Sequence, residues 1–322
     1  MSIIGIGETV YDIIFRSDQP QKAVPGGSAF NAMISLGRVF AHSSEPVRVA
    51  MITETGDDHI GQIITSFMRQ NHVSTDLVSI NIGTQSHISL AFLDEQSNAQ
   101  YEFYKDHASA KIDASKVEGL RFEASDVVLF GSFFAINPVL LNYTRALFTA
   151  AHEAGATLYY DINFRKSHIK DIPDTIGNLE ENMRLATVVR GSAEDFGYLY
   201  GTEDSHKIYK DYICPHCPIF ICTDGPRASW LFAPNEANPG TTMSIRIPTT
   251  ALPNVVSTIG AGDNFNAGFI YALTRCGIHA DDLSTLTPPQ WMHLVETGQQ
   301  FSAHVCQRIE NYVAEDFIPT LG

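Results

Sequence analysis

The feature that most restricts the fold of this chain is a series of short apolar segments that recur along most of its 322 residues. They are rich in β-branched and aromatic residues, and several lack polar alternation, as strands buried on both faces do. They cover residues 3–6, 47–52, 127–130, 157–162, 187–189 and 219–222. Strands of this kind belong to parallel sheets whose two faces are covered by helices.

Helical stretches separate these strands. One is predicted over residues 28–41, and another follows Asp57-Asp58, two acidic residues that suit a first helical turn. A third is expected to begin at Pro138 and to end at Gly155. The order of strands and helices predicts an α/β fold with a mostly parallel sheet and helices on both of its faces.

Two segments, at about residues 8–25 and 82–107, interrupt the alternation. Each reads as extended chain with polar breaks, and the second contains two apolar runs separated by residues 94–100, as in a hairpin. We see no internal repeat and no long linker. The expectation is a single domain over residues 1–322, with these two segments forming a small β lid.

Charge and cysteine content restrict the partners. Lys and Arg number 21 against 36 Asp and Glu, so the formal charge of −15 gives no general attraction to nucleic acid or to anionic membranes. The N-terminus has no basic, signal-like region, no segment reaches the length of a membrane span, and the cysteine count of five is odd. These features predict a cytoplasmic protein with reduced thiols. Cys214-x-x-Cys217 is interpreted as two ordinary loop thiols, because a second pair that would complete a zinc site is missing.

The strongest functional signal lies near the C-terminus. Gly260-Ala261-Gly262 precedes an apolar pattern with helical spacing, so this turn places several backbone N–H groups at a helix N-terminus, where the helix dipole favours an anion. Asp263 falls in the first helical turn and is able to take a proton from an attacking hydroxyl. From these four residues alone, Asp263 is equally well explained as a helix-capping residue.

The stretch Gly260-Ala261-Gly262-Asp263-x-Phe265 resembles the C-terminal motif of the ribokinase-like (PfkB) carbohydrate kinases. The resemblance implies that the Gly260, Ala261 and Gly262 amides form an anion hole and that Asp263 is the catalytic base. It also implies a ribokinase-like fold, and ATP with Mg²⁺ as cofactors. Ser257 stands where this family often has Asp, so a monovalent cation, which some members bind, is left open.

A second motif, Gly26-Gly27-x-x-x-Asn31, combines a backbone suited to close approach with a polar side chain in a first helical turn. In the resembled family the glycine pair is a lid hinge that lines the sugar site, and Asp12 matches a sugar-binding acid. By resemblance, Gly26, Gly27, Asn31 and Asp12 are therefore predicted to bind substrate.

Asp161-x-Asn163-x-Arg165 follows a buried strand and resembles a stretch of fructokinases and 2-keto-3-deoxygluconate kinases. Side chains at the carboxyl end of a parallel strand face the ligand crevice, and Arg165 can bind phosphate or substrate oxygens bidentately. Tyr104, in the predicted lid, is either a substrate contact or a packing residue.

The nucleotide side is less distinct. Ser192-x-x-Asp195 occupies the place of the family's Asn-x-x-Glu motif, so Ser192 and Asp195 are predicted to lie near the nucleotide, with Asp195 facing the metal through water. Thr223-x-Gly225 resembles the family's nucleotide turn.

The resemblance implies ATP-dependent phosphorylation of a sugar hydroxyl, with fructose as the leading substrate and 2-keto-3-deoxygluconate or another sugar as the alternative. Family members often form dimers through the lid, so a homodimer is expected. A catalytically silent sugar-binding regulator on the same fold is the non-enzyme alternative. A dinucleotide-dependent oxidoreductase is disfavoured because Val10 stands where the fingerprint that begins at Gly5-x-Gly7 requires glycine, and a P-loop is absent.

Overall fold

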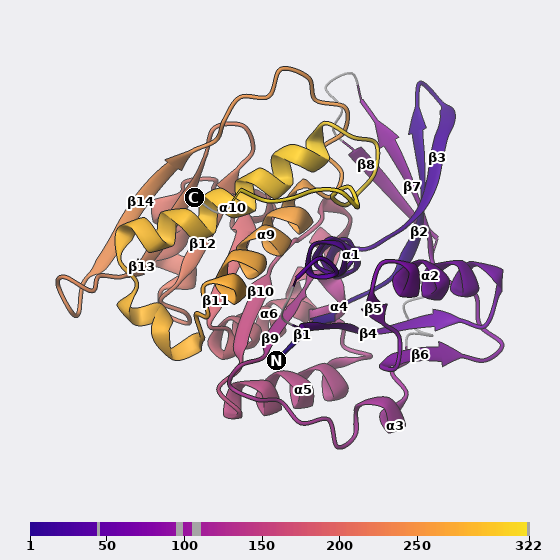
Figure 1. Ribbon diagram of the computed structural model, residues 1–322, viewed down its shortest axis with the longest axis horizontal. Coiled ribbons are helices and arrows are strands. Elements are labelled where there is room, and N and C mark those ends of the chain that lie inside the picture. The colour runs from indigo at the N-terminus through magenta and orange to yellow at the C-terminus, as the bar shows by residue number, and fades with distance from the viewer. Residues whose placement is uncertain (44–45, 95–98, 105–110, 321–322) are drawn as a thin grey trace.

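A ten-stranded sheet forms the centre of the protein (Figure 1). The computed structural model describes residues 1–43, 46–94, 99–104 and 111–320. The sheet has the order β14-β13-β12-β11-β10-β9-β1-β4-β5, and β6 also pairs with β4. All its pairings are parallel except those of β12 with β13 and of β13 with β14. The strands are β1 (Ser2–Ile6), β4 (Arg48–Gly56), β5 (Val73–Ser74), β6 (Val78–Asn81), β9 (Val127–Gly131), β10 (Thr157–Asp161), β11 (Val188–Ser192), β12 (Phe220–Asp224), β13 (Ala228–Pro234) and β14 (Thr242–Pro248).

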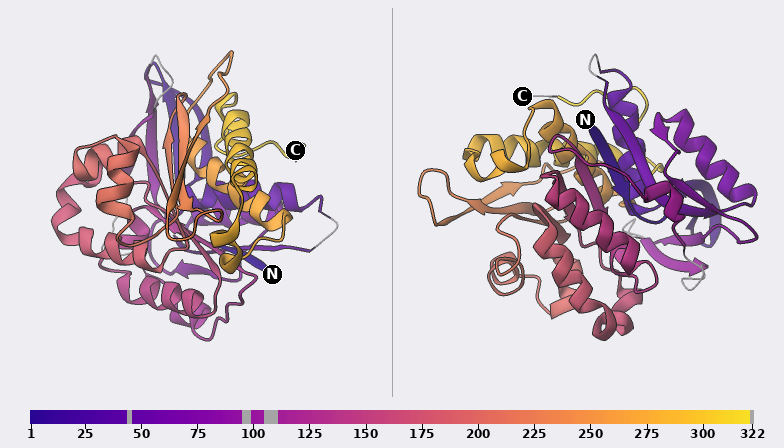
Figure 2. Two further views of the ribbon diagram at one scale, coloured as in Figure 1. Left: turned by 90° about the vertical axis from the view of Figure 1, so that its left-hand side faces the viewer. Right: turned by 90° about the horizontal axis from the view of Figure 1, so that it is seen from below.

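Helices cover both faces of this sheet, as the sequence predicts (Figure 2). Neighbouring residues of each central strand enter opposite cores: Ile3 packs in the core under α1, α9 and α10, whereas Ile4 packs in the core under α5 and α6. The helices are α1 (Ser28–Phe40), α2 (His59–Gln70), α3 (Ala114–Val117), α4 (Ser132–Ile136), α5 (Leu141–Glu153), α6 (Ile172–Leu185), α7 (Ala193–Tyr200), α8 (Ser205–Ile208), α9 (Ala261–Arg275) and α10 (Pro288–Cys306). Two-sided burial explains why the strands lack polar alternation.

The third predicted helix begins later than expected. Asn137 accepts a hydrogen bond from the Val139 amide (3.0 Å) in a turn, and α5 begins only at Leu141, so Pro138 precedes the helix.

A small four-stranded sheet of order β3-β2-β7-β8 lies beside the main body, where the sequence predicts the lid (Figure 1). Its strands are β2 (Val10–Arg16), β3 (Gln19–Gly26), β7 (Ile88–Leu93) and β8 (Ala99–Tyr104). Parts of the predicted second lid segment, residues 95–98 and 105–107, lie outside the described residues. The small sheet is anchored to the body by its own apolar cluster, in which Ile14 and Ala91 pack with Ile259, the residue that precedes Gly260.

Helix α9 is held between α1 and α10 by close backbone packing. A Cβ atom added to Gly268 of α9 would lie 2.5 Å from the Thr297 carbonyl oxygen and 2.8 Å from the Gly298 Cα of α10. These distances are shorter than real Cβ contacts, so only glycine lets α9 approach α10 this closely. The position of the N-terminus of α9 therefore depends on this contact.

We expect Gly268→Ala to lower the free energy of unfolding by about 2 kcal/mol or more, because the new methyl group meets backbone atoms that cannot move aside. Gly177 in α6 is the matched control, since it is also helical but has nothing within 4 Å of its added Cβ. Gly177→Ala should instead stabilise the protein by ~0.5–1 kcal/mol through helix propensity. Urea unfolding of both variants measures this difference, and destabilisation of similar size in the two variants would contradict it.

Candidate active site

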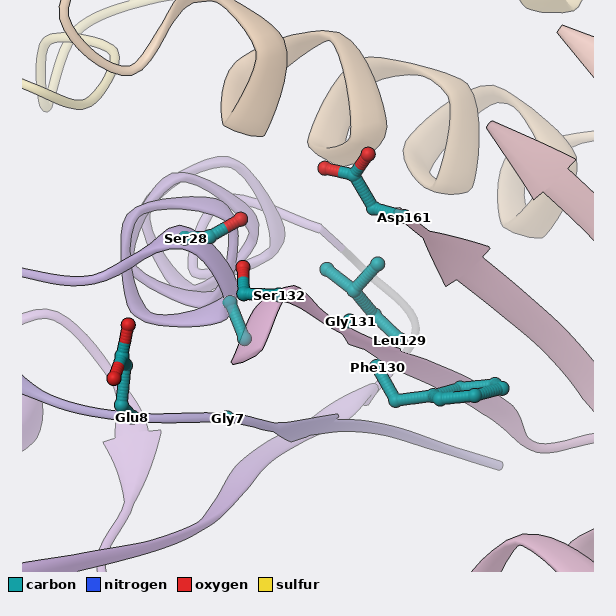
Figure 3. A pocket seen from close by; sticks show the side chains of 9 residues that line it. Gly7, Glu8, Ser28, Leu129, Phe130, Gly131, Ser132 and Asp161 are labelled. Atoms are coloured by element: carbon teal, nitrogen blue, oxygen red, sulfur yellow. The ribbon is translucent and has the colours of Figure 1, made fainter. Parts of the chain in front are cut away.

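The polar side chains of interest gather at the carboxyl edge of the main sheet, where its strand order reverses. Strand β1 pairs with β4 on one side and with β9 on the other, and the chain visits β4 first. In open α/β sheets the crevice at such a switch point is the usual ligand site. Here Glu8 follows β1 and Ser132 follows β9, and both face one small cavity with Ser28 and Asp161 (Figure 3).

An adjoining cavity, the main cavity below, lies between this edge and the small sheet. Residues from both parts of the molecule line it: Glu8, Val10, Asp12, Gly27, Ser28, Asn31, Tyr101, Phe103, Ser132, Phe133, Asn163, Arg165, His168 and Asp263. Five residues that the sequence predicts as site residues, Asp12, Gly27, Asn31, Arg165 and Asp263, thus meet in one cavity.

The Asp263 carboxylate lies where two helices begin. It belongs to the first turn of α9, and both of its oxygens accept hydrogen bonds from the first turn of α1: Oδ1 from the Ser28 hydroxyl and Oδ2 from the Asn31 amide, each at 2.8 Å. Asp263 is buried, with 6% of the residue exposed, and this burial raises the pKa of its carboxyl, although Asn31, Arg165 and Ser28 act against the shift. A raised pKa makes Asp263 a stronger proton acceptor than an ordinary aspartate.

The turn before Asp263 has the geometry of an anion site. Gly260 is the N-cap of α9 with φ of 75°, a left-handed conformation that suits glycine. The Ala261 amide, which the sequence predicts in the anion hole, instead donates to the Thr258 carbonyl oxygen (3.2 Å). The first helical amides available beyond it are those of Gly262, as predicted, and of Asp263 in place of Gly260 and Ala261. A Cβ on Gly262 would lie 2.9 Å from Nη1 of Arg190, which places a guanidinium directly behind this turn.

Arg190 belongs to a buried polar network under the turn. Its Nη1 forms an ion pair with Asp161 (3.0 Å) and its Nη2 donates to the Thr223 hydroxyl (2.6 Å). The other Asp161 oxygen accepts from the Asn266 amide of α9 (2.7 Å). Burial opposes the charge of Arg190, but its pKa is raised because the attraction to Asp161, Tyr159 and Asp195 together outweighs that burial. The site therefore keeps a fixed cation behind Gly262.

Asp12 lies on β2 of the small sheet, with 4% of its surface exposed. Its carboxylate accepts hydrogen bonds from the Ser89 hydroxyl of β7 and, at 3.0 Å, from the Asn311 amide. Burial raises the pKa of Asp12 to about 7; Asp263 and Glu8 add to the rise, while Ser89 and Arg165 oppose it. Asp12 is thus an acid in the main cavity that changes charge near neutral pH.

The two glycines of the N-terminal motif allow backbone and carboxylate to come close together. A Cβ on Gly26 would lie 2.0 Å from Oδ2 of Asp12, and one on Gly27 would lie 2.3 Å from the Glu8 carbonyl oxygen. Gly27 also has φ of 123°, which side chains rarely adopt. Any larger residue at Gly26 would occupy the space of the Asp12 carboxylate.

The structure does not bring Tyr104 into the main cavity. Side chains of a strand alternate between its faces, and β8 directs Tyr101 and Phe103 into the cavity while Tyr104 is 60% exposed. The Arg165 guanidinium lies over the Tyr101 ring, 5.5 Å from its centroid. Of the two interpretations left open for Tyr104, the substrate contact is therefore not supported, and Tyr101 and Phe103 of the same strand line the cavity instead.

The residues predicted for the nucleotide side follow one another along the sheet edge. Ser192 and Thr223 are register partners at the ends of β11 and β12, and Gly225 has φ of 50° in the turn after β12. Ser192 and Asp195 form a capping box on α7: the Asp195 amide donates to the Ser192 hydroxyl (3.1 Å) and the Ser192 amide to the Asp195 carboxylate (2.7 Å). Burial raises the pKa of Asp195 to about 6, and nearby Asp161 adds to the rise.

Ser132, Phe133 and His168 line the main cavity but escaped sequence reasoning, whereas Asn163 belongs to the Asp161-x-Asn163-x-Arg165 motif. Ser132 and Asn163 both have positive φ, at 55° and 38°, and Asn163 donates to the Ser132 hydroxyl (2.9 Å). Strained backbone of this kind concentrates at functional sites. The His168 ring stacks on Phe133 at 4.1 Å and faces Asp171 at 2.9 Å. The only sequence signal of Ser132 and Phe133 is their position just after a predicted buried strand, which many loop residues share, and His168 has no such signal.

Two further features of the chain are its potential metal ligands and its cysteines. Within the described ranges, no group of three or more His, Cys, Asp or Glu side chains is arranged to hold a metal ion. The Ser257 hydroxyl is buried and accepts from the Ile259 amide (3.1 Å).

Cys217 is a free, buried thiol, and burial raises its pKa to about 11, as expected of an ordinary thiol. Among the described helices, none is long and apolar enough to cross a membrane.

Strand β1 is followed by β2 and not by a helix, so Gly5-x-Gly7 lacks the structural context of a dinucleotide-binding fingerprint.

Known proteins share both the sequence and the architecture. The chain is 22% identical over 294 residues to a probable chloroplastic fructokinase-6 of Arabidopsis thaliana, covering 88% of this chain and 71% of the relative. It is 22% identical over 258 residues to a 5-dehydro-2-deoxygluconokinase of Geobacillus thermodenitrificans, covering 77% and 72%. The crystal structure of fructokinase from Vibrio cholerae O395, in its fructose, ADP and calcium ion bound form, matches with a TM-score of 0.80 at 18% identity, covering 98% of this chain and 96% of that one.

The solved structure establishes the ribokinase-like fold. Residues 2–309, nearly the whole chain, match the pfkB family of carbohydrate kinases. The site described above lies inside this match. The chain therefore belongs to the pfkB carbohydrate kinase family.

Proposed function

We propose that this protein is a fructokinase-like enzyme that transfers the γ-phosphoryl group of ATP to a hydroxyl of a neutral sugar, with Asp263 as the general base. The observation that carries the proposal is the buried Asp263 carboxylate beside the N-terminal amides of α9, at the wall of a cavity that also contains Asp12 and Asn31. A base and an anion site in contact are what phosphoryl transfer to an alcohol requires.

The chain's own residues divide the work as follows. Asp12 and Asn31 hold sugar hydroxyls by accepting and donating hydrogen bonds. Asp263 takes the proton of the attacking hydroxyl as the sugar oxygen bonds to the γ-phosphorus and the bond from that phosphorus to the β–γ bridging oxygen breaks. The amides of Gly262 and Asp263, with Arg190 behind them, face the charge on the transferred group.

ATP, when bound, supplies the phosphoryl group and leaves as ADP. The residues that fit it are the α9 N-terminus and the sheet edge from Ser192 through Thr223 to Gly225. Among the described residues, no group of three or more His, Cys, Asp or Glu side chains is arranged to hold a metal ion. Mg²⁺ would therefore be held mainly by phosphates and water, and Asp195 is the candidate for a water-mediated contact. A monovalent cation would meet the neutral Ser257 hydroxyl rather than a carboxylate.

The charges in the main cavity favour a neutral sugar over a sugar acid. Three carboxyl groups, those of Glu8, Asp12 and Asp263, line it, and they would repel a substrate carboxylate. Arg165 is the feature that supports the second candidate, a 2-keto-3-deoxygluconate or similar sugar acid, because a guanidinium can bind a carboxylate bidentately. A homodimer through the small sheet and a cytoplasmic location stay predictions.

The first test measures ADP release from ATP and Mg²⁺ across neutral keto and aldo sugars, sugar acids and nucleosides. We expect fructose to have the highest kcat/KM. Asp263→Asn should lower kcat by about 10²–10⁴-fold while the sugar KM changes little, because the variant keeps the side-chain shape and loses the base. A silent regulator would bind sugar without releasing ADP, and near-normal turnover by Asp263→Asn would contradict the assigned base.

The sugar KM should depend on pH through Asp12. As the pH falls through about 7, the Asp12 carboxylate takes up a proton and can accept fewer hydrogen bonds from the sugar. The KM should therefore rise toward acidic pH and level off on the alkaline side. Initial rates between pH 5.5 and 9 measure it, with Asp12→Asn as the control that should abolish the dependence. A KM that is flat with pH in the wild-type protein would refute this role.

The two tyrosines of β8 form a matched pair. Tyr101→Ala should raise the sugar KM by about 10-fold, because it removes a cavity wall and the ring beneath Arg165. Tyr104→Ala, three residues along the same strand and exposed, should leave the KM within about two-fold. Steady-state kinetics of both variants, with melting temperatures to check folding, make the comparison. Equal effects of the two substitutions would mean that β8 acts on folding only.

A further inference from the structure

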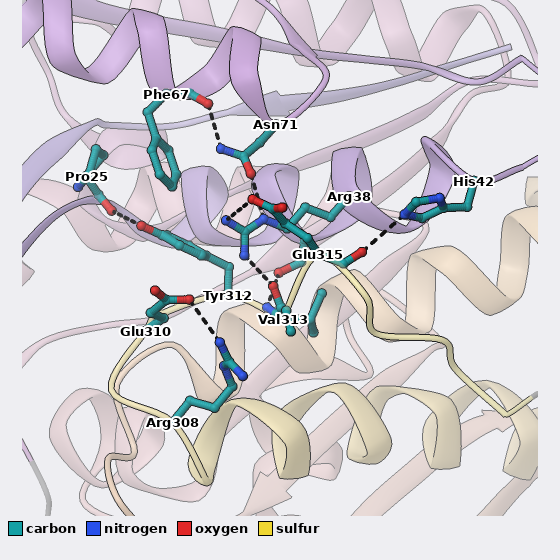
Figure 4. A network of polar contacts seen from close by, with 12 residues as sticks. Pro25, Arg38, His42, Phe67, Asn71, Arg308, Glu310, Tyr312, Val313 and Glu315 are labelled. Atoms are coloured by element: carbon teal, nitrogen blue, oxygen red, sulfur yellow. Dashed lines mark hydrogen bonds and ion pairs between the residues drawn. The ribbon is translucent and has the colours of Figure 1, made fainter.

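The segment that follows α10 passes through the site and is fixed on both sides of Asn311. On one side, Glu310 accepts from Lys22 of β3 (2.7 Å). On the other side, the Val313 carbonyl oxygen accepts from Arg38 of α1 (2.6 Å), as Figure 4 shows, and the Val313 amide donates to the Ser35 hydroxyl (3.1 Å). These contacts join the small sheet and α1, so Asn311 has little freedom to move.

Asn311 contacts both the proposed sugar-binding acid and the helix whose N-terminus forms the proposed anion site. Its side-chain amide donates to Oδ2 of Asp12 (3.0 Å), the acid on the small sheet. Its backbone carbonyl oxygen accepts from the Asn264 amide of α9 (2.7 Å) and lies 2.6 Å from the position that a Cβ of Gly260 would occupy. Asn311 is fully buried. One residue thus connects the sugar-binding acid with the start of the anion-site helix.

We propose that Asn311 is a positioning residue for the sugar site: its amide orients Asp12 and keeps it charged, and its backbone fixes that acid relative to the N-terminus of α9. The proposal rests on the kinase function above, since Asp12 matters only if it binds a sugar. A hydrogen bond donated to a carboxylate favours the charged form. Burial, Asp263 and Glu8 work against the Asp12 charge, whereas the Ser89 hydroxyl and Arg165 support it. The Asn311 amide is a second hydrogen-bond donor to this carboxylate, beside Ser89.

Removing the amide should therefore raise the pKa of Asp12 above its already high value of about 7. A rise of about one pKa unit would reduce the ionised fraction at pH 7 from about one half to about one tenth. The sugar KM should then rise about five-fold at pH 7 and converge on the wild-type value near pH 9. If the substitution only disturbed the structure of the site, the sugar KM would rise at every pH.

The test compares Asn311→Ala and Asn311→Leu with Tyr312→Phe over pH 5.5–9. The Leu variant removes the donor but fills the space, so it keeps the test valid if the Ala variant loosens the segment. Tyr312→Phe is the matched control: it loses a hydrogen bond to the Pro25 carbonyl oxygen (3.5 Å) in the same segment without touching Asp12. Both Asn311 variants should show the five-fold, pH-dependent KM effect with kcat little changed, and the control should match the wild type. An unchanged KM, or one raised equally at pH 7 and pH 9, overturns the proposal.

A readout that needs no turnover separates this inference from the proposed function. The ¹³C signal of the Asp12 carboxyl, assigned by its absence in Asp12→Asn, can be titrated in the wild-type protein and in Asn311→Leu. An upward shift of the midpoint in the variant supports the positioning role, and an unchanged midpoint refutes it. If no sugar in the panel yields ADP, the kinase proposal fails, while this titration still decides whether Asn311 controls the charge of Asp12.

Discussion

The site depends on one buried contact, the Asp263 carboxylate held between the first turns of α1 and α9. Each helix directs unpaired backbone amides and the positive end of its dipole to its N-terminus, and each begins after a glycine with positive φ. Two such ends would repel each other, and a carboxylate between them compensates for both. The base of the proposed reaction is therefore also the group that lets the two helices meet, which explains why both of its oxygens are already hydrogen-bonded.

A chain with a negative net charge can bind a polyphosphate only where a few fixed groups create a positive potential. With a formal charge of −15, the protein as a whole does not attract ATP. The α9 N-terminus and the Arg190 guanidinium packed against Gly262 supply local compensation. Pairing Arg190 with Asp161 lowers the cost of burying its charge, and tying Asp161 to Asn266 fixes both to α9. Local geometry thus replaces overall charge as the means of binding an anion.

Sequence reasoning predicted those features that leave a local pattern. Buried strands produce apolar runs, so the sheet followed from the residues themselves. A small-residue turn before a helix produces the Gly260–Asp263 motif, but the role of Asp263 as base came from the resemblance of this motif to a known family. For β8, sequence reasoning left Tyr104 open as a substrate contact or a packing residue. The strand alternates Tyr101 and Phe103 with Gln100 and Glu102, and this period of two marks the side that faces the cavity in the structure. Arg190 and Asn311 left no signal, because their partners lie in other elements and, for Asp12 and Asn311, 299 residues away.

Besides covering the main cavity, the small sheet is linked to the start of α9, because Asp12 of β2 contacts Asn311 and Asn311 contacts α9. Asp12 is carried by β2, which is joined to the main body through the apolar cluster around Ile259 and through the segment that holds Asn311. Both connections lead to the residues next to Gly260, so the small sheet is joined by direct contacts to the start of α9. In the proposed reaction, the acid that binds the sugar and the amides that face the transferred phosphoryl group therefore belong to one connected part of the structure, and the contacts of Asn311 fix the distance between them.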